Sequence, residues 1–386
     1  MSKTIVVLGA SGSVGTQALD VARARGYTVD LISANTNEKE AERAAREFRP
    51  RYLAMANADA AKGMKVRLAD TDVKIFSGEA GICEAIGECS AETVVNSILG
   101  EAGLMPTLAT IDAGRRLALA NKESLVIAGD IVMARAAERG TEILPVDSEH
   151  CAIYQSLMCG KRFEIKRLIL TASGGPFFGK SKEELRAVTL SDTLAHPTWK
   201  MGKKITVDSA TLMNKGFEIV EAAHLFGVTS DKIKVVVHRE SILHSAVEYI
   251  DNSIIGEFSV PDMRMCVQYA VDYPDRLSGV ASELDLAALG KMTFAEVDDE
   301  AFPLLSLAKR AIAMGGGMCA VMNAADEVAV EAFLQGKIGF TDISDAVIST
   351  FGKMESAKHV TSLEDIIASD REARSVAKAY VKEILA

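Results

Sequence analysis

A strand-like run followed at once by a glycine-rich turn opens the chain and constrains its fold more than any other feature. Residues 4–8 (TIVVL) predict a strand, residues 9–15 (GASGSVG) a tight turn, and residues 14–25 an amphipathic helix. Glycines in such a turn let a pyrophosphate approach the amides of the helix N-terminus; a glycine turn without a ligand is the alternative. The pattern predicts a dinucleotide site.

Short apolar runs continue to alternate with helical segments as far as residue 147. The further strand candidates are residues 28–33, 52–56, 93–99, 117–120 and 143–146, and helical segments such as 38–47 lie between several of them. This alternation is typical of a parallel sheet covered by helices. We therefore expect an α/β fold with a Rossmann-like domain at residues 1–147.

The pattern changes after residue 147. Strand candidates at 167–170, 205–207 and 235–237 precede two runs, 242–250 and 254–259, that flank an Asp251-Asn252 turn and predict a hairpin. A central α+β domain is expected at 148–285. A linker at 286–300 and a C-terminal helical bundle at 301–386 complete the predicted organisation.

Charge and composition exclude several classes of function. The chain of 386 residues carries 43 Lys+Arg against 53 Asp+Glu, a net charge of −10, which disfavours a nucleic-acid or anionic-membrane partner. The longest run without a charged residue, 311–325, has 15 residues and is shorter than the ~20 of a membrane span. With no leader segment before residue 4, we expect a cytoplasmic protein. Six cysteines without a CxxC pair are expected to be reduced thiols buried in the core, rather than ligands of a zinc ion or parts of a disulfide framework.

The segment after the second strand bears on which dinucleotide is bound. It reads Ser33-Ala-Asn35-Thr36-Asn37 and holds no acidic residue of the kind that binds the ribose hydroxyls of NAD. Lys39 and Arg43 lie just beyond it. This favours NADP, with a solvated helix face as the alternative role of the two cations.

Acidic residues at two places predict a site for a hard cation. Asp147 and Glu149 follow the strand at 143–146, and a spacing of two in extended backbone points both carboxylates to one side. Glu218, with Asn214 and Lys215, occupies one face of a later helix and offers a third carboxylate. Oxygen ligands suit Mg²⁺ or Mn²⁺ rather than zinc, although Asp-x-Glu pairs also occur as helix caps.

Serine and glycine at two predicted strand ends suit a phosphate. Ser173-Gly-Gly-Pro follows the strand at 167–170 and Asp208-Ser209 follows 205–207, while Lys215 offers positive charge; two ordinary turns are the alternative. Residues 196–202 (HPTWKMG) contain the only tryptophan in a segment without a clear period, which indicates a lid or a hinge between domains. His238 and His244 flank Ser241, where a structural role is the ordinary one.

Eight motifs, taken in chain order, carry a resemblance to a known family. They are GASGSVG (9–15), ANKES (120–124), PVDSEH (145–150), TASGGPF (171–177), HPTWKMG (196–202), DS (208–209), NKGFE (214–218) and NAADEVA (323–329). Together they closely resemble the 1-deoxy-D-xylulose 5-phosphate reductoisomerases. No single motif is decisive, but their order along the whole chain makes chance agreement implausible.

The resemblance implies an NADPH-dependent enzyme of isoprenoid biosynthesis that uses Mg²⁺ or Mn²⁺, is usually a homodimer and has three domains. It implies that Asp147, Glu149 and Glu218 hold the metal ion, and that Lys122, Glu149, His196 and Glu218 are catalytic. The implied substrate contacts are Lys122, Ser148, Glu149, Ser173, His196, Ser209, Asn214, Lys215, Glu218, Ser241 and His244, among which Ser173, Ser209, Asn214 and Lys215 hold the phosphate. The implied NADPH contacts are Ser11, Gly12, Ser13, Val14, Asn35, Thr36, Asn37, Asn121, Glu123, Met201, Gly202 and Met263.

The implied chemistry breaks and remakes a carbon–carbon bond of the sugar phosphate. For the family, this rearrangement is most often written as a retro-aldol step followed by an aldol step. A divalent cation stabilises the negative charge of an enediolate, Lys122 adds a positive group, and hydride from NADPH reduces the aldehyde to give 2-C-methyl-D-erythritol 4-phosphate. A lid would limit the loss of reactive fragments.

Three segments depart from the family pattern. Thr36 stands where a lysine facing the 2′-phosphate is common, His-Pro-Gln-Ser reads His238-Arg239-Glu240-Ser241, and Asp326 replaces the usual asparagine. Two other classes share features of the chain. A hydroxy-acid dehydrogenase would more naturally show clustered arginines, and a non-catalytic dinucleotide-binding scaffold would not need three carboxylates.

Overall fold

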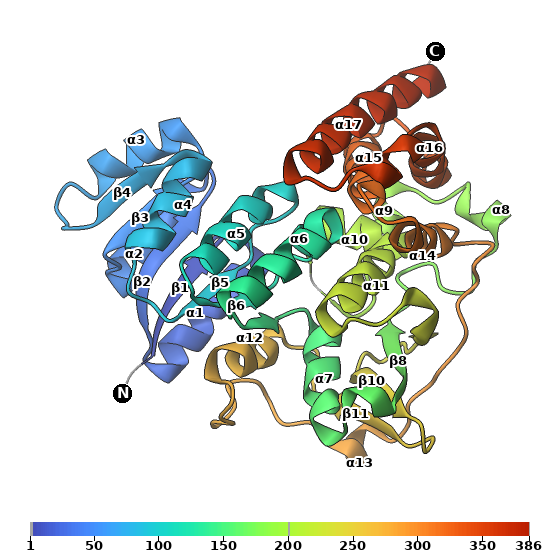
Figure 1. Ribbon diagram of the computed structural model, residues 1–386, viewed down its shortest axis with the longest axis horizontal. Coiled ribbons are helices and arrows are strands. Elements are labelled where there is room, and N and C mark those ends of the chain that lie inside the picture. The colour runs from blue at the N-terminus through green and yellow to red at the C-terminus, as the bar shows by residue number, and fades with distance from the viewer. Residues whose placement is uncertain (1–2, 200, 386) are drawn as a thin grey trace. The chain divides into compact units, whose positions relative to one another are not determined.

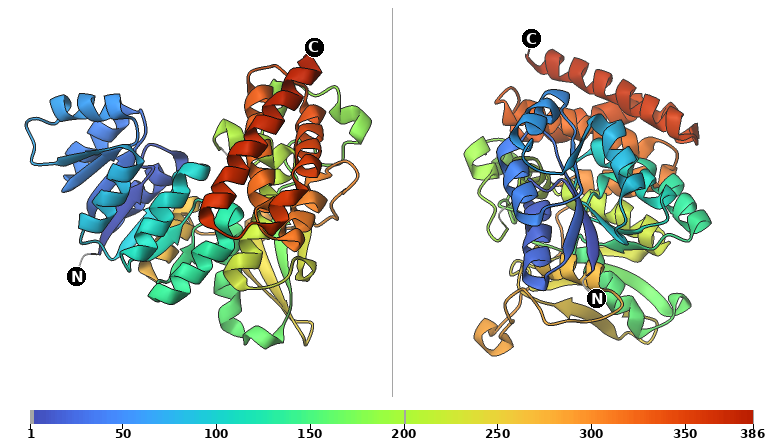
Figure 2. Two further views of the ribbon diagram at one scale, coloured as in Figure 1. Left: turned by 45° about the horizontal axis from the view of Figure 1, so that its top comes forward. Right: turned by 90° about the vertical axis from the view of Figure 1, so that its left-hand side faces the viewer.

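The computed structural model describes residues 3–199 and 201–385, which fall into two compact units. Unit 1 comprises the chain up to Ser124, Asp130–Tyr154 and Asp262–Glu283. Unit 2 comprises Leu125–Gly129, Gln155–Pro261 and the chain from Leu284 onward. Figures 1 and 2 show the elements of both units.

Unit 1 is built on a seven-stranded parallel sheet in the order β4-β3-β2-β1-β5-β6-β7. Its strands are β1 (Thr4–Leu8), β2 (Thr28–Ala34), β3 (Tyr52–Met55), β4 (Lys74–Ser77), β5 (Thr93–Asn96), β6 (Arg116–Leu119) and β7 (Ile143–Pro145). Its helices are α1 (Ser13–Arg25), α2 (Glu38–Phe48), α3 (Ala58–Arg67), α4 (Gly78–Glu88), α5 (Leu104–Asp112) and α12 (Met263–Asp272). The chain reverses direction across the sheet beside β1, where α/β sheets bind their ligands.

Helices cover both faces of this sheet because its strands are apolar on both sides. Ile5 and Val7 pack with buried residues of α1, α2, α3 and α12, whereas Val6 and Leu8 pack with Ile82 and neighbouring residues of α4. The prediction of an α/β fold with a parallel, helix-covered sheet is confirmed. The short edge strand β4, with two exposed residues in KIFS, was not predicted.

Unit 2 contains a four-stranded sheet in the order β11-β10-β8-β9. Its strands are β8 (Ile165–Ala172), β9 (Ile233–Val237), β10 (Leu243–Tyr249) and β11 (Ile254–Phe258). β10 is antiparallel to β8 and β11, as the predicted hairpin requires, and β8 is parallel to β9. The helices are α8 (Lys182–Leu185), α9 (Leu190–Thr193), α10 (Lys203–Ala210), α11 (Met213–Phe226), α13 (Leu286–Leu289), α14 (Leu304–Met314), α15 (Met318–Leu334), α16 (Phe340–Lys353) and α17 (Leu363–Leu385).

Two helices contribute residues to both units: α6 (Glu123–Arg139) and α7 (Ser148–Ser156). Ala128 interrupts α6 with a non-helical φ of −139° and ψ of 37°.

One sequence prediction in unit 2 is wrong. Residues 205–207 form part of helix α10 rather than a strand. The run Ile-Thr-Val is β-branched, but Val207 and Ala210 lie on the side of the helix that enters the core of unit 2. Tertiary packing outweighs the small intrinsic preference of these residues.

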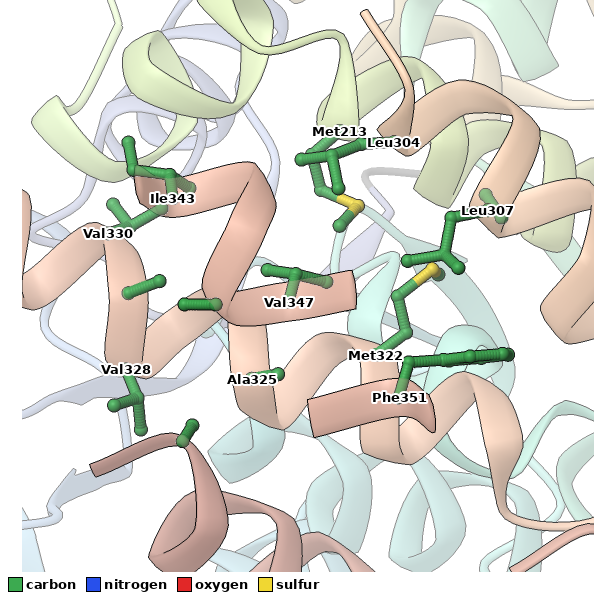
Figure 3. Packing of buried hydrophobic residues seen from close by; sticks show 14 of the residues in the cluster. Met213, Leu304, Leu307, Met322, Ala325, Val328, Val330, Ile343, Val347 and Phe351 are labelled. Atoms are coloured by element: carbon green, nitrogen blue, oxygen red, sulfur yellow. The ribbon is translucent and has the colours of Figure 1, made fainter. Parts of the chain in front are cut away.

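The core of unit 2 joins residues from two of the predicted domains. Phe217 and Val220 of α11 pack in one cluster with residues of α14, α15, α16 and α17. Figure 3 shows part of it, where Met213 and Leu304 lie close together and Met322 lies near Leu307 and Phe351. Segment 262–283, within the predicted central domain, packs in unit 1 instead. The division of the chain into three functional domains stays a prediction.

Two predictions from composition can be compared with the structure. Among the described residues, no helix combines the length and the apolar character needed to cross a bilayer. All six cysteines are free, but Cys159 is exposed rather than part of a core.

Candidate active site

The glycine-rich turn after β1 has the backbone that its sequence predicts. Gly9 has a φ of +77°, and a Cβ there would lie 2.7 Å from the Ser97 carbonyl oxygen beyond β5. A Cβ on Gly15 would lie 2.2 Å from the Gly9 carbonyl oxygen, so only glycine fits. Gly12 precedes α1 and provides no side-chain cap, which leaves N-terminal amides of the helix available to an anion.

The other predicted cofactor contacts of unit 1 have defined positions. Asn35 and Thr36 are exposed after β2, and Asn37 caps α2 by accepting a hydrogen bond from the Glu40 amide at 3.3 Å. Buried Asn121 donates from its side-chain amide to the carbonyl oxygens of Ile98 (2.7 Å) and Gly100 (2.9 Å), and to Glu123 (3.0 Å). The side chain of Asn121 therefore joins the loop after β6 to the loop after β5. Partly buried Met263 begins α12.

Lys122 and Asp147 come from the ends of neighbouring strands β6 and β7 and form an ion pair. Lys122 Nζ lies 2.6 Å from Asp147 Oδ2, and both side chains are about nine-tenths buried. His150 Nδ1 lies 3.0 Å from the other carboxylate oxygen. Burial raises the pKa of Asp147, but the charge of Lys122 and the hydrogen bond with His150 outweigh it and hold that pKa well below its usual range.

Glu149 lies in the first turn of helix α7, so the expectation of extended backbone from Asp147 to Glu149 is wrong. Asp147 Oδ1 accepts a hydrogen bond from the Glu149 amide at 3.2 Å, which is the capping arrangement that a short acidic residue favours before a helix. Buried Ser148 donates its hydroxyl to the Glu149 carboxylate at 2.5 Å. Both acidic residues lie in unit 1, which also contains Lys122.

Asn214, Lys215 and Glu218 form one cluster on α11, as the helical spacing predicts. Asn214 Nδ2 donates to Glu218 Oε1 at 2.5 Å, and Lys215 Nζ pairs with Glu218 Oε2. The side chains of Lys215 and Glu218 are 4% and 1% exposed. A buried carboxylate thus has a cation beside it, in a helix that belongs to unit 2.

Ser173 and His196 are joined directly. Ser173 Oγ lies 3.0 Å from His196 Nε2 and accepts a hydrogen bond from the Gly175 amide at 3.2 Å. His196 Nδ1 accepts hydrogen bonds from the amides of Thr198 (3.2 Å) and Trp199 (2.9 Å). Burial, and next the charge of Arg239, lower the pKa of His196 to about 4.

The structure also brings the Ser173 loop against Ser209. A Cβ on Gly175 would lie 2.8 Å from the Ser209 carbonyl oxygen and 3.2 Å from Ala210 Cα, so the loop touches the C-terminal part of α10. Ser209 lies inside that helix and not after a strand. Ser173 and Ser209, two of the four residues predicted to hold the phosphate, therefore lie on adjacent backbone segments.

The remaining candidates of unit 2 lie around Trp199. The half-buried Trp199 ring makes an edge contact with the His244 ring, with centroids 6.2 Å apart. His244 Nε2 lies 3.2 Å from the Ser259 carbonyl oxygen, and Ser241 is buried with a φ of +52°. Met201 is partly buried and Gly202 exposed; Lys200, within the predicted lid, lies outside the described residues. Both ring nitrogens of His238 contact backbone groups, an arrangement typical of a structural histidine.

Sequence reasoning gave no role to several residues that contact the candidates. His150 binds Asp147, and its position three residues along the helix is a signal that could have identified it. Arg239 binds the carbonyls of the Ser173 loop. Asp326, noted only as a departure, lies 2.9 Å from Lys204 of α10. No local pattern relates these last residues to their distant partners.

Three family models match successive parts of the chain. Residues 5–129 match 1-deoxy-D-xylulose 5-phosphate reductoisomerase, residues 143–226 match the 1-deoxy-D-xylulose 5-phosphate reductoisomerase C-terminal domain, and residues 258–376 match the DXP reductoisomerase C-terminal domain.

Relatives match the chain along its length. A 1-deoxy-D-xylulose 5-phosphate reductoisomerase of Acetivibrio thermocellus is 49% identical over 382 residues, which cover 99% of this chain and 100% of that protein. The Zymomonas mobilis reductoisomerase in complex with NADPH is 41% identical with a TM-score of 0.90, and covers 99% of both chains. A DOX-P reductoisomerase in complex with NADPH, fosmidomycin and magnesium is 37% identical with a TM-score of 0.94, again over 99% of both chains. This chain belongs to the 1-deoxy-D-xylulose 5-phosphate reductoisomerase family.

Proposed function

We propose that the chain rearranges and reduces 1-deoxy-D-xylulose 5-phosphate to 2-C-methyl-D-erythritol 4-phosphate, with NADPH as the reductant and Mg²⁺ or Mn²⁺ as the metal ion. The observation that carries this proposal is the full-length identity to a curated reductoisomerase, because a match of 49% over 99% of the chain includes every candidate segment. The geometry within each unit supports the roles of individual residues.

NADPH fits the end of the sheet at β1. Gly9 and Gly15 leave no room for side chains, and the N-terminus of α1 has no side-chain cap, so the backbone amides of Ser11, Ser13 and Val14 are offered to a phosphate. The Gly12 amide itself donates to the Gly9 carbonyl oxygen at 2.9 Å. Asn35, Thr36 and exposed Lys39 follow β2, where a ribose and its 2′-phosphate bind in such folds. Asn121 and Glu123 shape the neighbouring loop, while Met201, Gly202 and Met263 complete the proposed contacts.

A hard divalent cation fits the proposed ligands Asp147, Glu149 and Glu218, because all three offer carboxylate oxygens. Asp147 is ionised across the neutral range, since its pKa is low. The lysines paired with Asp147 and Glu218 balance the charges of these two carboxylates. Magnesium in a homologue's complex agrees with this donor set.

The phosphate of the substrate is proposed to bind Ser173, Ser209, Asn214 and Lys215. The contact of the Ser173 loop with the backbone of Ser209 supports the first two. Lys215 offers an ammonium group on the adjoining helix α11, and α10 packs against α11. Ser148, Ser241 and His244 are proposed to contact the sugar.

A bound divalent cation supplies a Lewis acid for negative charge that develops on the sugar, and NADPH supplies the hydride. Lys122 holds a further positive charge beside Asp147, and its near-complete burial strengthens that charge's effect on an anion. His196 is neutral and donates from Nε2, so it orients oxygen atoms rather than adding charge. Residues 196–202 exclude water as a lid.

We also propose that the protein is a homodimer and works in the cytoplasm. β11 lies at an edge of the unit 2 sheet in the described part of the chain, and its side chains Ile254 and Phe258 are 57% and 45% exposed. An edge strand with exposed apolar side chains is suited to pairing with a second copy. Cell fractionation tests the proposed location.

The activity is tested by following NADPH oxidation with 1-deoxy-D-xylulose 5-phosphate, with and without a chelator. We expect oxidation that stops on chelation and returns with Mg²⁺ or Mn²⁺. Glu218→Gln should weaken metal binding, measured by calorimetry, because an amide coordinates a hard cation less well. NADPH oxidation that survives complete metal removal would contradict the proposal.

A further inference from the structure

Arg239 contacts the loop that carries Ser173 at two points. Its Nη1 donates hydrogen bonds to the carbonyl oxygens of Ser173 (3.2 Å) and Gly175 (2.7 Å). Its guanidinium also lies over the ring of Phe178, 5.4 Å from the ring centroid. The Arg239 carbonyl oxygen in turn accepts a hydrogen bond from the Thr198 hydroxyl at 3.4 Å. One residue therefore joins this loop to segment 196–202.

The loop needs such a contact because its own sequence leaves it free to move. Gly174 and Gly175 have successive φ values of +75° and +61°, a conformation that glycine adopts at little cost but does not hold by itself. A charged donor shared by the two carbonyls on either side of Gly174 restricts the loop to one conformation. Ser173 Oγ is thereby fixed relative to Ser209.

The hydrogen bonds around His196 determine where the hydroxyl proton of Ser173 points. Nδ1 of His196 accepts from two amides, so it carries no proton, and a neutral ring then carries its proton on Nε2. Nε2 donates to Ser173 Oγ, which also accepts from the Gly175 amide. With both acceptor positions used, the hydroxyl of Ser173 has its proton left to donate to a ligand.

We propose that Arg239 is a positioning residue for substrate phosphate: by holding the carbonyls of Ser173 and Gly175, it keeps the Ser173 hydroxyl oriented as a hydrogen-bond donor to a phosphoryl oxygen. The inference rests on the proposed role of Ser173 in phosphate binding. Arg239 acts through the loop and does not itself touch the substrate. Its positive charge also favours neutral His196, and only the neutral ring combines an acceptor Nδ1 with a donor Nε2.

The test compares two substrates in matched variants. Arg239→Met removes the shared donor, Arg239→Lys keeps the charge and one donor, and Arg310→Met is the control. Arg310 likewise lies over an aromatic ring, Phe351 at 5.3 Å, and pairs with Glu355, but within residues 3–199 and 201–385 it makes no hydrogen bond, ion pair or ring contact with a candidate residue of the site. kcat and KM are measured for 1-deoxy-D-xylulose 5-phosphate, for 1-deoxy-D-xylulose without the phosphate, and for NADPH.

For the phosphorylated substrate, we expect the kcat/KM of Arg239→Met to be about tenfold lower than that of wild type, mainly because KM rises. A loss of this size is typical when one hydrogen bond to a charged group is removed. The value for the sugar without phosphate and the KM for NADPH should stay within about twofold. Arg239→Lys should fall between wild type and Arg239→Met, which keeps the proposal testable if Arg239→Met does not fold. Arg310→Met should match wild type.

Equal losses on both substrates, or no loss, would overturn the role of Arg239. Ser173→Ala separates this failure from failure of the phosphate site itself. If Ser173→Ala leaves the preference for the phosphorylated substrate unchanged, the proposed phosphate site is wrong. The positioning role of Arg239 is then wrong as well. If Ser173→Ala lowers that preference and Arg239→Met does not, only the positioning role is wrong. A non-additive double variant is expected, since both changes act on one hydroxyl.

Discussion

At the scale of the residue, the proposed site is made of charges that compensate one another while buried. Lys215 and Glu218 form such a pair, and removing one of them takes away the opposite charge beside the other in the interior. We expect Lys215→Met to lower the free energy of unfolding by ~3 kcal/mol. The double variant with Glu218→Gln should recover part of that loss. Urea unfolding of the two single variants and the double variant measures the coupling; additive losses would show that the pair is not compensating.

His196 provides a second prediction at this scale. Its folded pKa of about 4 lies below the value of about 6.5 in an unfolded chain, so between these pH values the unfolded state binds more protons. His196 therefore contributes stability that is present above pH ~6.5 and lost as the pH falls toward ~4. NMR titration of the ring should show no protonation between pH 6 and 8. A midpoint above pH 6 would contradict the neutral ring.

At the scale of the element, helix α10 is anchored by a buried charge cluster. Lys204 Nζ lies 2.7 Å from Asp208 Oδ2 and 2.9 Å from Asp326 Oδ2 on α15, and 4.8 Å from the Phe217 ring centroid. This cluster gives a physical account of the aspartate at position 326. Because α10 also carries Ser209 and begins after segment 196–202, the cluster supports two proposed parts of the site.

Asp326 allows a test by pH. Burial raises its pKa, and Lys204 and a hydrogen bond with Asp208 only partly oppose that; Glu327, itself paired with Arg374 of α17, raises it further. A raised folded pKa means that its stabilisation is present below pH ~3.8 and is lost as the pH rises through the folded value. The thermal stability of Asp326→Asn relative to wild type should therefore increase as the pH rises above ~3.8, because the asparagine side chain cannot ionise. Melting temperatures that differ by the same amount at every pH would rule out the raised pKa.

Segment 196–202 provides a further test at this scale, because Trp199 is the only tryptophan. Its ring contacts His244, and its amide binds His196. Substrate or a phosphonate analogue, added with metal ion and NADPH, should shift the fluorescence emission to the blue or quench it. Trp199→Ala should lose activity while unfolding within ~1 kcal/mol of wild type, whereas a loss of ~3 to 5 kcal/mol would identify a core residue. If none of these ligands changes the emission, residues 196–202 do not form a lid.

At the scale of the whole molecule, the exposed edge strand β11 predicts self-association. Ile254→Lys places a charge on this edge, and charged side chains prevent edge-to-edge pairing. We expect the variant to be a monomer by light scattering at concentrations where wild type is a dimer. Lys62→Glu, on the exposed surface of α3, is the control. A dimer that survives Ile254→Lys would place the interface elsewhere.

The amino-acid sequence alone determined the features that depend on short-range pattern. Alternation of apolar runs with amphipathic segments fixed the parallel sheet of unit 1, because each strand and helix has its own period. The glycine turn after β1 and the shared helix face of Asn214, Lys215 and Glu218 could also be predicted from the sequence. Both depend on neighbours within a few residues. Asp147 and Glu149 were found, but their local backbone was not, because the start of α7 has no strong helical period.

Tertiary structure decided what depends on partners distant in the chain. It made residues 205–207 helical, since their apolar side is buried in the core of unit 2. It placed Lys122 beside Asp147, Arg239 on the carbonyls of the Ser173 loop, and Asp326 against Lys204. Each of these contacts joins a charge to a partner 25 or more positions away. No local period encodes such a pairing, which forms only when packing brings the two segments together and burial makes an unpaired charge costly.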